Sequence, residues 1–213
     1  MTPALLVIAK APVAGRVKTR LCPPCTPDQA ATLARAALED TLAACDAAAA
    51  ASGARRVLVL DGAPGDWLPA GWDVVAQRGA GLAERLAAGF ADAGGPALLV
   101  GMDTPQVGPE LLRGGLAALG IADAVLGPAP DGGYWAIGLR TPDARVFAGV
   151  PMSRRNTGAI QRARLAALRL DTFLLPALRD VDDIAAARAV AGSAPAGRFA
   201  AALAALDLEA VPA

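Results

Sequence analysis

The chain of 213 residues contains no histidine, only two lysines and only three cysteines. Without histidine it cannot build a Ser-His-Asp or Cys-His catalytic centre, a histidine-ligated zinc or haem site, or an imidazole proton shuttle. Unless the cysteines take part, a metal site must use carboxylates and other oxygen ligands, which suit Mg²⁺ or Mn²⁺.

Aromatic residues are also scarce, at 4% of the chain, so the core must be built mainly from leucine, valine, isoleucine and alanine. The 20 basic and 20 acidic side chains leave no excess charge for attracting nucleic acid or an acidic membrane. No apolar run reaches the roughly 20 residues that cross a bilayer, and the N-terminus lacks a signal-peptide layout. We therefore expect a soluble, cytoplasmic protein that binds neither nucleic acid nor membranes.

Apolar runs alternate with helix-forming segments along the chain. Strands are predicted at residues 4–9, 55–60, 72–76, 97–100, 122–126, 134–139 and 172–175. Helices are predicted at residues 26–51, 81–93, 109–120, 155–169 and 181–192, with one more after residue 195 before the end frays. Thr26 and Gln29 form a capping box with Pro27 in the first turn. This order predicts an α/β fold, a mostly parallel central sheet with helices on both faces, in a single domain over residues 1–213.

The loop after the first strand is the most basic part of the chain, with Lys10, Arg16, Lys18 and Arg20 within eleven residues. Ligands of such sheets bind at the carboxyl ends of the strands, which is where this loop lies. Gly15 permits close approach of the backbone to a ligand, and the cations neutralise phosphate oxygens. The glycine patterns of a Walker A loop or a dinucleotide fingerprint are missing. Because both lysines lie here, we favour an anion-binding loop over a solvated basic one, with Lys18 exposed.

Carboxylates follow two other predicted strands. Asp103 comes directly after the fourth strand, where it could meet a metal–phosphate complex; the alternative is a helix cap or an Asx turn. Asp180, Asp182 and Asp183 surround the start of the predicted helix 181–192. They are most simply caps that complement the helix dipole, and they could equally complete a metal site with Asp103.

Three further segments carry weaker signals. Asp131-Gly132-Gly133 before an apolar strand is an ordinary turn signal, or a loop whose glycines let a substrate reach backbone N–H groups beside Asp131. Cys22 and Cys25 are expected to be reduced thiols, neither a redox pair nor half of a zinc site. The arginines at 154, 155, 162, 164 and 169 are interpreted as a helix face rather than an acceptor site.

Together these motifs resemble a bacterial glycosyltransferase-A-like family related to 2-phospholactate guanylyltransferase and molybdenum-cofactor guanylyltransferase. The resemblance spans about residues 4–192 and departs from the family at Ala83, where glycine is usual. It implies the nucleotide-diphospho-sugar transferase fold, also called GT-A or Rossmann-like. It also implies a nucleotide-binding set of Ala9, Lys10, Pro12, Gly15, Arg16, Lys18, Gln77, Gly79, Gly81 and Leu82, and a substrate-binding set of Asp131, Gly132, Gly133 and Tyr134.

The residues favour nucleotidyl transfer, dependent on Mg²⁺ (or Mn²⁺), over glycosyl transfer. Glycosyl transfer usually needs an Asp-x-Asp metal motif, whereas Asp103 stands alone and the loop cations suit a departing pyrophosphate. We predict Lys18, Arg20 and Asp103 as catalytic residues, and Asp103 and Asp182 as metal ligands.

The expected partners are a nucleoside triphosphate, or a nucleotide sugar, and a small phosphate- or phosphonate-like acceptor; a homodimer is left open. The alternatives are a glycosyltransferase that uses a nucleotide-diphospho-sugar donor and a nucleotide-binding module without turnover.

Overall fold

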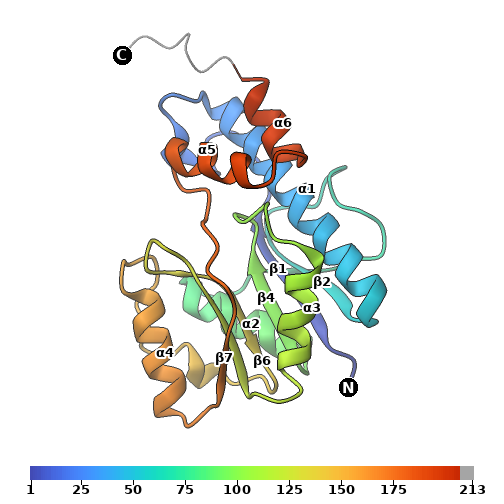
Figure 1. Ribbon diagram of the computed structural model, residues 1–213, viewed down its shortest axis with the longest axis vertical. Coiled ribbons are helices and arrows are strands. Elements are labelled where there is room, and N and C mark those ends of the chain that lie inside the picture. The colour runs from blue at the N-terminus through green and yellow to red at the C-terminus, as the bar shows by residue number, and fades with distance from the viewer. Residues whose placement is uncertain (207–213) are drawn as a thin grey trace.

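The computed structural model describes residues 1–206, whose centre is a seven-stranded sheet of order β3-β2-β1-β4-β6-β5-β7 (Figure 1). Its strands are β1 (Ala4–Lys10), β2 (Arg55–Asp61), β3 (Asp73–Ala76), β4 (Ala97–Gly101), β5 (Ala124–Pro128), β6 (Tyr134–Leu139) and β7 (Thr172–Leu174). Only β6 runs antiparallel to its neighbours, β4 and β5. The predicted α/β class with a mostly parallel sheet is confirmed.

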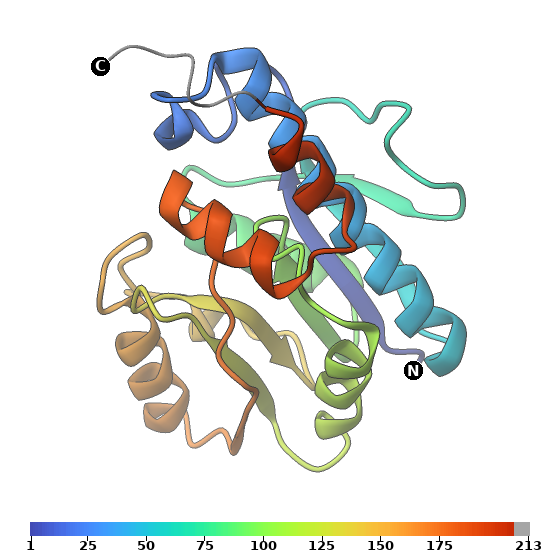
Figure 2. The same ribbon diagram turned by 45° about the horizontal axis from the view of Figure 1, so that its top comes forward.

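Helices cover both faces of the sheet, as the two views show (Figures 1 and 2). The α-helices are α1 (Pro27–Ser52), α2 (Leu82–Ala93), α3 (Pro109–Ala118), α4 (Thr157–Ala167), α5 (Ile184–Ser193) and α6 (Arg198–Ala204). Short 3-10 turns lie at η1 (Thr19–Leu21) and η2 (Ala144–Val146). Helices α1 and α3 pack on one face, α2 and α4 on the other, and α5 and α6 pack against α1. None of the helices within residues 1–206 has the length and apolar character of a membrane span.

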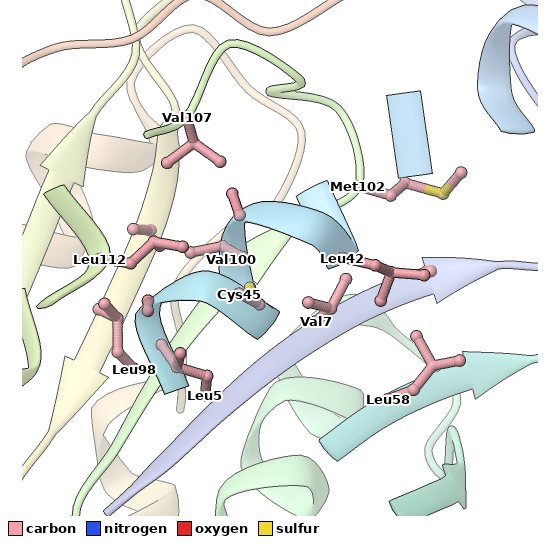
Figure 3. Close-up of a cluster of buried hydrophobic side chains, with 14 of the residues drawn as sticks. Leu5, Val7, Leu42, Cys45, Leu58, Leu98, Val100, Met102, Val107 and Leu112 are labelled. Carbon is pink, nitrogen blue, oxygen red and sulfur yellow. The ribbon is translucent and has the colours of Figure 1, made fainter. Parts of the chain in front are cut away.

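The alternation of side chains along β1 builds both halves of the core. Leu5 and Val7 point to the face covered by α1, where they pack with Leu42 and Cys45 (Figure 3). Leu6, from the other side of the pleat, packs in the cluster that contains Phe90 of α2. A strand buried on both faces reads as a continuous apolar run, which is why β1 was evident in the sequence.

Helix starts are set by local hydrogen bonds. The predicted capping box is confirmed: Thr26 Oγ1 accepts from Gln29 N at 3.2 Å, and Gln29 Oε1 accepts from Thr26 N at 2.8 Å. Helix α5 starts later than predicted, at Ile184, because Asp183 is its N-cap and accepts from Ala186 N. The predicted fraying of the chain end lies outside the described residues.

The arginines between residues 154 and 169 do not lie on one helix face, contrary to the prediction. Helix α4 begins only at Thr157, so Arg154 and Arg155 lie in the loop before it. The Thr157 hydroxyl donates to Pro151 O and accepts from Arg154 N, which holds the loop in a turn.

Candidate functional site

The pairing of β1 with β4 brings the basic loop and the Asp103 turn together. The two strands are parallel neighbours, with Val7 opposite Val100 and Ile8 opposite Gly101. Their carboxyl ends therefore share one edge of the sheet, from which the loop after Lys10 and the turn containing Asp103 both begin. Asp103 O also accepts from Val181 N at 2.9 Å, which ties the segment before α5 to the same place.

Lys18 is the centre of this arrangement. Its backbone has the left-handed conformation, with φ 49°, and its side chain is only 9% exposed. Its Nζ lies 2.5 Å from Asp103 Oδ1 and also donates to the carbonyl oxygen of Val181. The expectation of an exposed Lys18 is therefore wrong, because the side chain spans the interior between three segments rather than entering solvent.

Asp180 is one of the three carboxylates before α5 that the sequence offers as caps or as metal ligands with Asp103. Its Oδ1 atom is buried and has no hydrogen-bond partner within residues 1–206. The pKa of Asp180 is raised to about 7, first by burial and then by the negative charges of Asp131, Asp103 and Asp182, whereas the charge of Lys18 opposes the shift. Four carboxylates and one ammonium group thus share one electrostatic environment.

The other carboxylates before α5 divide into two roles. Asp182 is half exposed, and its Oδ2 lies 3.4 Å from Arg20 Nη1. Asp183 caps α5, so the capping interpretation holds for this residue. The signal in the sequence was the cluster of three carboxylates, but only tertiary packing distinguishes Asp180 from the cap.

The carboxylates suit a divalent ion that is shared with a phosphate. Among residues 1–206, no three histidine, cysteine, aspartate or glutamate side chains form a complete metal site by themselves. Mg²⁺, however, usually binds one or two carboxylates and completes its shell with water and substrate phosphates. The unpaired Oδ1 of Asp180, beside Asp103 and Asp182, is an oxygen donor of this kind. Asp103 and Asp182 as metal ligands remain a prediction, and among the three carboxylates considered for that site the buried Oδ1 of Asp180 makes this residue a further candidate.

Cations for phosphate binding remain on the basic loop. Lys10 and Arg16 are exposed, and their side chains form no ion pair or hydrogen bond within the described part of the chain. Gly15 lies between them with φ 75°, a conformation that glycine adopts without strain. Pro12 is half-buried in the same loop. The loop therefore offers two free charges, whereas Lys18 and Arg20 are paired with carboxylates.

The segment after β3 lies beside the end of β1. Gln77 Nε2 donates to Ala9 O at 2.8 Å and to Val59 O at 3.1 Å, so its amide joins neighbouring strands. Gly79 has φ 124°, and a Cβ at this position would lie 2.5 Å from Glu84 Cβ. Gly81 caps α2, whose first residue, Leu82, is exposed. These contacts give Gln77 and Gly79 roles in shaping the loop, and the nucleotide contacts of the segment remain a prediction.

The turn between β5 and β6 has its own internal hydrogen bonds. Asp131 Oδ1 accepts from Gly133 N at 2.9 Å, and Gly132 N donates to Ala129 O at 3.0 Å. Both glycine amides are thus already paired, as in an ordinary Asx turn. Tyr134 is half-buried, with its hydroxyl 3.4 Å from Gln161 Oε1 on α4. Contact of this turn with a substrate remains a prediction.

The three cysteines are free. Cys25 is buried, and burial, with the nearby Cys22, raises the pKa of its thiol. A raised pKa reduces the thiolate fraction and with it the reactivity of Cys25, while the reduced state of the thiols remains a prediction.

Comparison with known proteins places the chain in a family. The family described as "uncharacterized protein conserved in bacteria" (DUF2064) matches residues 29–154, more than half of the chain, and the chain belongs to it. The matched region includes Asp103 and the Asp131 turn. No curated protein matches the sequence. The closer kinship with the two guanylyltransferases remains a prediction.

Solved structures share the fold. A "putative nucleotide-diphospho-sugar transferase" from Desulfovibrio desulfuricans G20 has 30% identity and a TM-score of 0.76, over 86% of this chain and 84% of its own. CMP:2-keto-3-deoxy-manno-octonic acid synthetase, complexed with CTP, has 12% identity and a TM-score of 0.60, over 92% and 99% of the two chains. Rv0371c from Mycobacterium tuberculosis H37Rv, in complex with manganese, has 23% identity and a TM-score of 0.51, over 89% and 98%. The fold is that of nucleotide-diphospho-sugar transferases, and the likeness favours a nucleotide-using transferase.

Proposed function

We propose that this member of the DUF2064 family is a nucleotidyltransferase, which uses Mg²⁺ or Mn²⁺ to move a nucleoside monophosphate from a triphosphate to a small anionic acceptor. The observation that carries the proposal is the meeting of the basic loop with Asp103 and Asp180 at the shared edge of β1 and β4. Cationic and carboxylate groups side by side suit a metal–triphosphate complex better than either group alone.

In the proposed reaction an acceptor oxyanion attacks the α-phosphorus of the triphosphate. A phosphorus–oxygen bond to the acceptor forms while the bond to the β-phosphate oxygen breaks, and pyrophosphate leaves. Lys10 and Arg16 would neutralise the phosphates, and Asp103, with Asp180 or Asp182, would hold the metal, which supplies charge stabilisation when bound. Lys18 holds Asp103 in place through its ion pair. An anionic nucleophile needs no general base, which agrees with a chain that lacks histidine.

Glycosyl transfer is the second candidate, and the name of the Desulfovibrio relative favours it. Its donor would be a nucleotide-diphospho-sugar, whose diphosphate also needs a metal and cations. Two features of this chain favour the triphosphate. The turn after β4 carries one carboxylate rather than Asp-x-Asp, and the basic loop supplies two cations that no carboxylate neutralises within residues 1–206.

The test is a thermal-shift screen of nucleoside triphosphates, the matching nucleotide sugars and pyrophosphate, each with and without Mg²⁺ or Mn²⁺. A ligand at 100 times its dissociation constant stabilises a protein by about 2.7 kcal/mol, an easily measured shift. We expect one triphosphate to stabilise most, only with metal, and pyrophosphate to compete with it. Greater stabilisation by a nucleotide sugar, without competition from pyrophosphate, would support glycosyl transfer instead.

Turnover separates an enzyme from a module that only binds nucleotide. With the best triphosphate, release of pyrophosphate should depend on an added phosphate or phosphonate compound. Tight metal-dependent binding without pyrophosphate release over a broad acceptor set would support the binding module.

A further inference from the structure

The loop before α4 is packed directly on the turn between β5 and β6 (Figure 2). Gly158 N donates to Gly132 O at 2.8 Å. A Cβ at Gly132 would lie 1.7 Å from the carbonyl oxygen of Arg155, so the backbones of the two segments are in close contact. The conformation of the loop is defined by the buried Thr157, which bonds to Pro151 and Arg154. The backbone of Arg155 is therefore held against Gly132, and Arg154 precedes it in the same turn rather than on a helix.

These two arginines are free to bind an anion. Both are exposed, and neither guanidinium forms an ion pair or a hydrogen bond within residues 1–206. Some exposed arginines of the protein differ in this respect, since Arg78 pairs with Asp92 and Arg145 with Asp143. Two adjacent unpaired guanidinium groups offer the planar donors that bind phosphate oxygens in pairs.

Their place in the sheet puts them on the acceptor side of the proposed reaction. The basic loop follows β1, on one side of β4, whereas the Asp131 turn joins β5 to β6, on the other side. Near the end of β4, Val100 pairs with Ala136 near the start of β6, so the Asp131 turn lies at the same edge of the sheet as Asp103. An anion that approaches a bound triphosphate among these carboxylates is repelled unless positive charge lies beside it.

We propose that Arg154 and Arg155 bind the phosphate or phosphonate group of the acceptor on the β5–β6 side of Asp103. This assignment rests on the proposed function, because it presumes a nucleotide on the β1 side. It makes the acceptor a tetrahedral oxyanion of high charge rather than a neutral sugar hydroxyl. The arginine pair thereby decides which acceptors enter the site.

The test is a calorimetric titration of inorganic phosphate into protein that is already saturated with a non-hydrolysable triphosphate and Mg²⁺. The variant Arg154→Gln/Arg155→Gln removes both guanidinium groups. The control Arg162→Gln/Arg169→Gln removes the same charge from exposed arginines of α4 and the turn after it. A third variant, Arg154→Lys/Arg155→Lys, keeps the charge but loses the paired donors.

We expect the phosphate affinity of the Gln variant to fall by about tenfold or more, given the usual strength of hydrogen bonds to charged groups. The Lys variant should be intermediate and the control close to wild type. Methylphosphonate should behave as phosphate does, and acetate should bind more weakly. Equal losses in the Gln variant and the control, or an unchanged Gln variant, would overturn the assignment, as would acetate binding as tightly as phosphate.

The protein is first titrated with the triphosphate and Mg²⁺ until it is saturated, and this first titration separates the acceptor proposal from the proposed function. If the wild-type protein binds the triphosphate with Mg²⁺ but takes up neither phosphate nor methylphosphonate, the arginine assignment fails and the proposed function stands. If it binds no triphosphate, the proposed function fails first, and the acceptor assignment fails with it.

Discussion

Lys18 Nζ lies 2.5 Å from Asp103 Oδ1, and this ion pair joins the loop after β1 to the turn after β4. The ammonium group also donates to the carbonyl oxygen of Val181, so a single side chain connects three segments of the site. The lysine is nearly buried, whereas the carboxylate is 40% exposed. Removing the carboxylate should therefore destabilise the protein more than removing the lysine, because it leaves a desolvated positive charge without its partner.

A double-mutant cycle should reveal this coupling. Asp103→Asn leaves a desolvated ammonium group without its counter-charge, whereas Lys18→Met removes that charge together with its desolvation. We expect the double variant to recover stability lost in Asp103→Asn, with a coupling energy of about 1 kcal/mol or more. Urea denaturation of the four proteins measures it. The exposed pair Arg35 and Asp66 is the control and should show a smaller coupling; additive effects at Lys18 and Asp103 would contradict the prediction.

Asp103→Asn should also remove the Mg²⁺ dependence of nucleotide binding and abolish turnover. The amide keeps much of the hydrogen bonding but loses the charge that attracts a divalent ion. Nucleotide affinity measured across a Mg²⁺ titration tests this, and Asp182→Asn should act similarly if Asp182 is a ligand. Asp183→Asn is the matched control, because asparagine caps a helix as well as aspartate does. If the curves of wild type and Asp103→Asn coincide, Asp103 is not a metal ligand.

Arg16→Gln should weaken triphosphate binding without changing stability. The arginine is exposed and has no partner within residues 1–206, so its removal breaks no folded contact. A lost charge-assisted hydrogen bond corresponds to about 1.5–3 kcal/mol of binding. Triphosphate titrations of Arg16→Gln and of the control Arg188→Gln, an exposed arginine on α5, measure the difference. Equal affinities would indicate that the basic loop is a solvated surface that does not bind phosphate.

The raised pKa of Asp180 makes the stability of the metal-free protein depend on pH. Its pKa is about 7 in the folded protein and about 4 in an unfolded chain. Between these values the folded state holds more protons, so the contribution of this group to stability falls as pH rises from about 4 to about 7. We expect this decline to be smaller in Asp180→Asn, so that the stability of the variant relative to wild type is greater at pH 8 than at pH 5. Urea denaturation across that range, without metal, is the measurement; parallel curves would contradict the shift.

Gly132→Ala should destabilise the protein more than Gly149→Ala does. Both glycines have positive φ, 92° and 75°, which costs an alanine about 1 kcal/mol. Only Gly132 faces backbone, the carbonyl of Arg155, whereas the Cβ position at Gly149 is open. The steric clash should add ~1–3 kcal/mol at Gly132. Equal losses of stability in the two variants, measured by thermal or urea unfolding, would show that the loop before α4 moves away from the added methyl group at little cost.

The location of the candidate site could largely be predicted because the carboxyl edge of a parallel sheet follows from local patterns. Apolar runs such as residues 4–9 place the following loop at that edge, so the position of Lys10, Arg16 and Asp103 there was predictable, whereas their roles remain predictions. The capping box at Thr26 was likewise a short-range pattern. The Asp131 turn also matched its signal, because an Asx turn is set by neighbouring residues.

What the sequence by itself determined was the order of strands and helices, since side-chain periodicity and capping act over a few residues. Only the tertiary structure decided that the side chain of Lys18 is nearly buried, that Asp180 rather than Asp183 is affected by the other carboxylates, and that Arg155 lies against Gly132. Each of these depends on burial and charge from segments far apart in the chain. A local sequence pattern cannot predict these features, because the segments that bury a side chain or place a charge beside it lie elsewhere in the chain.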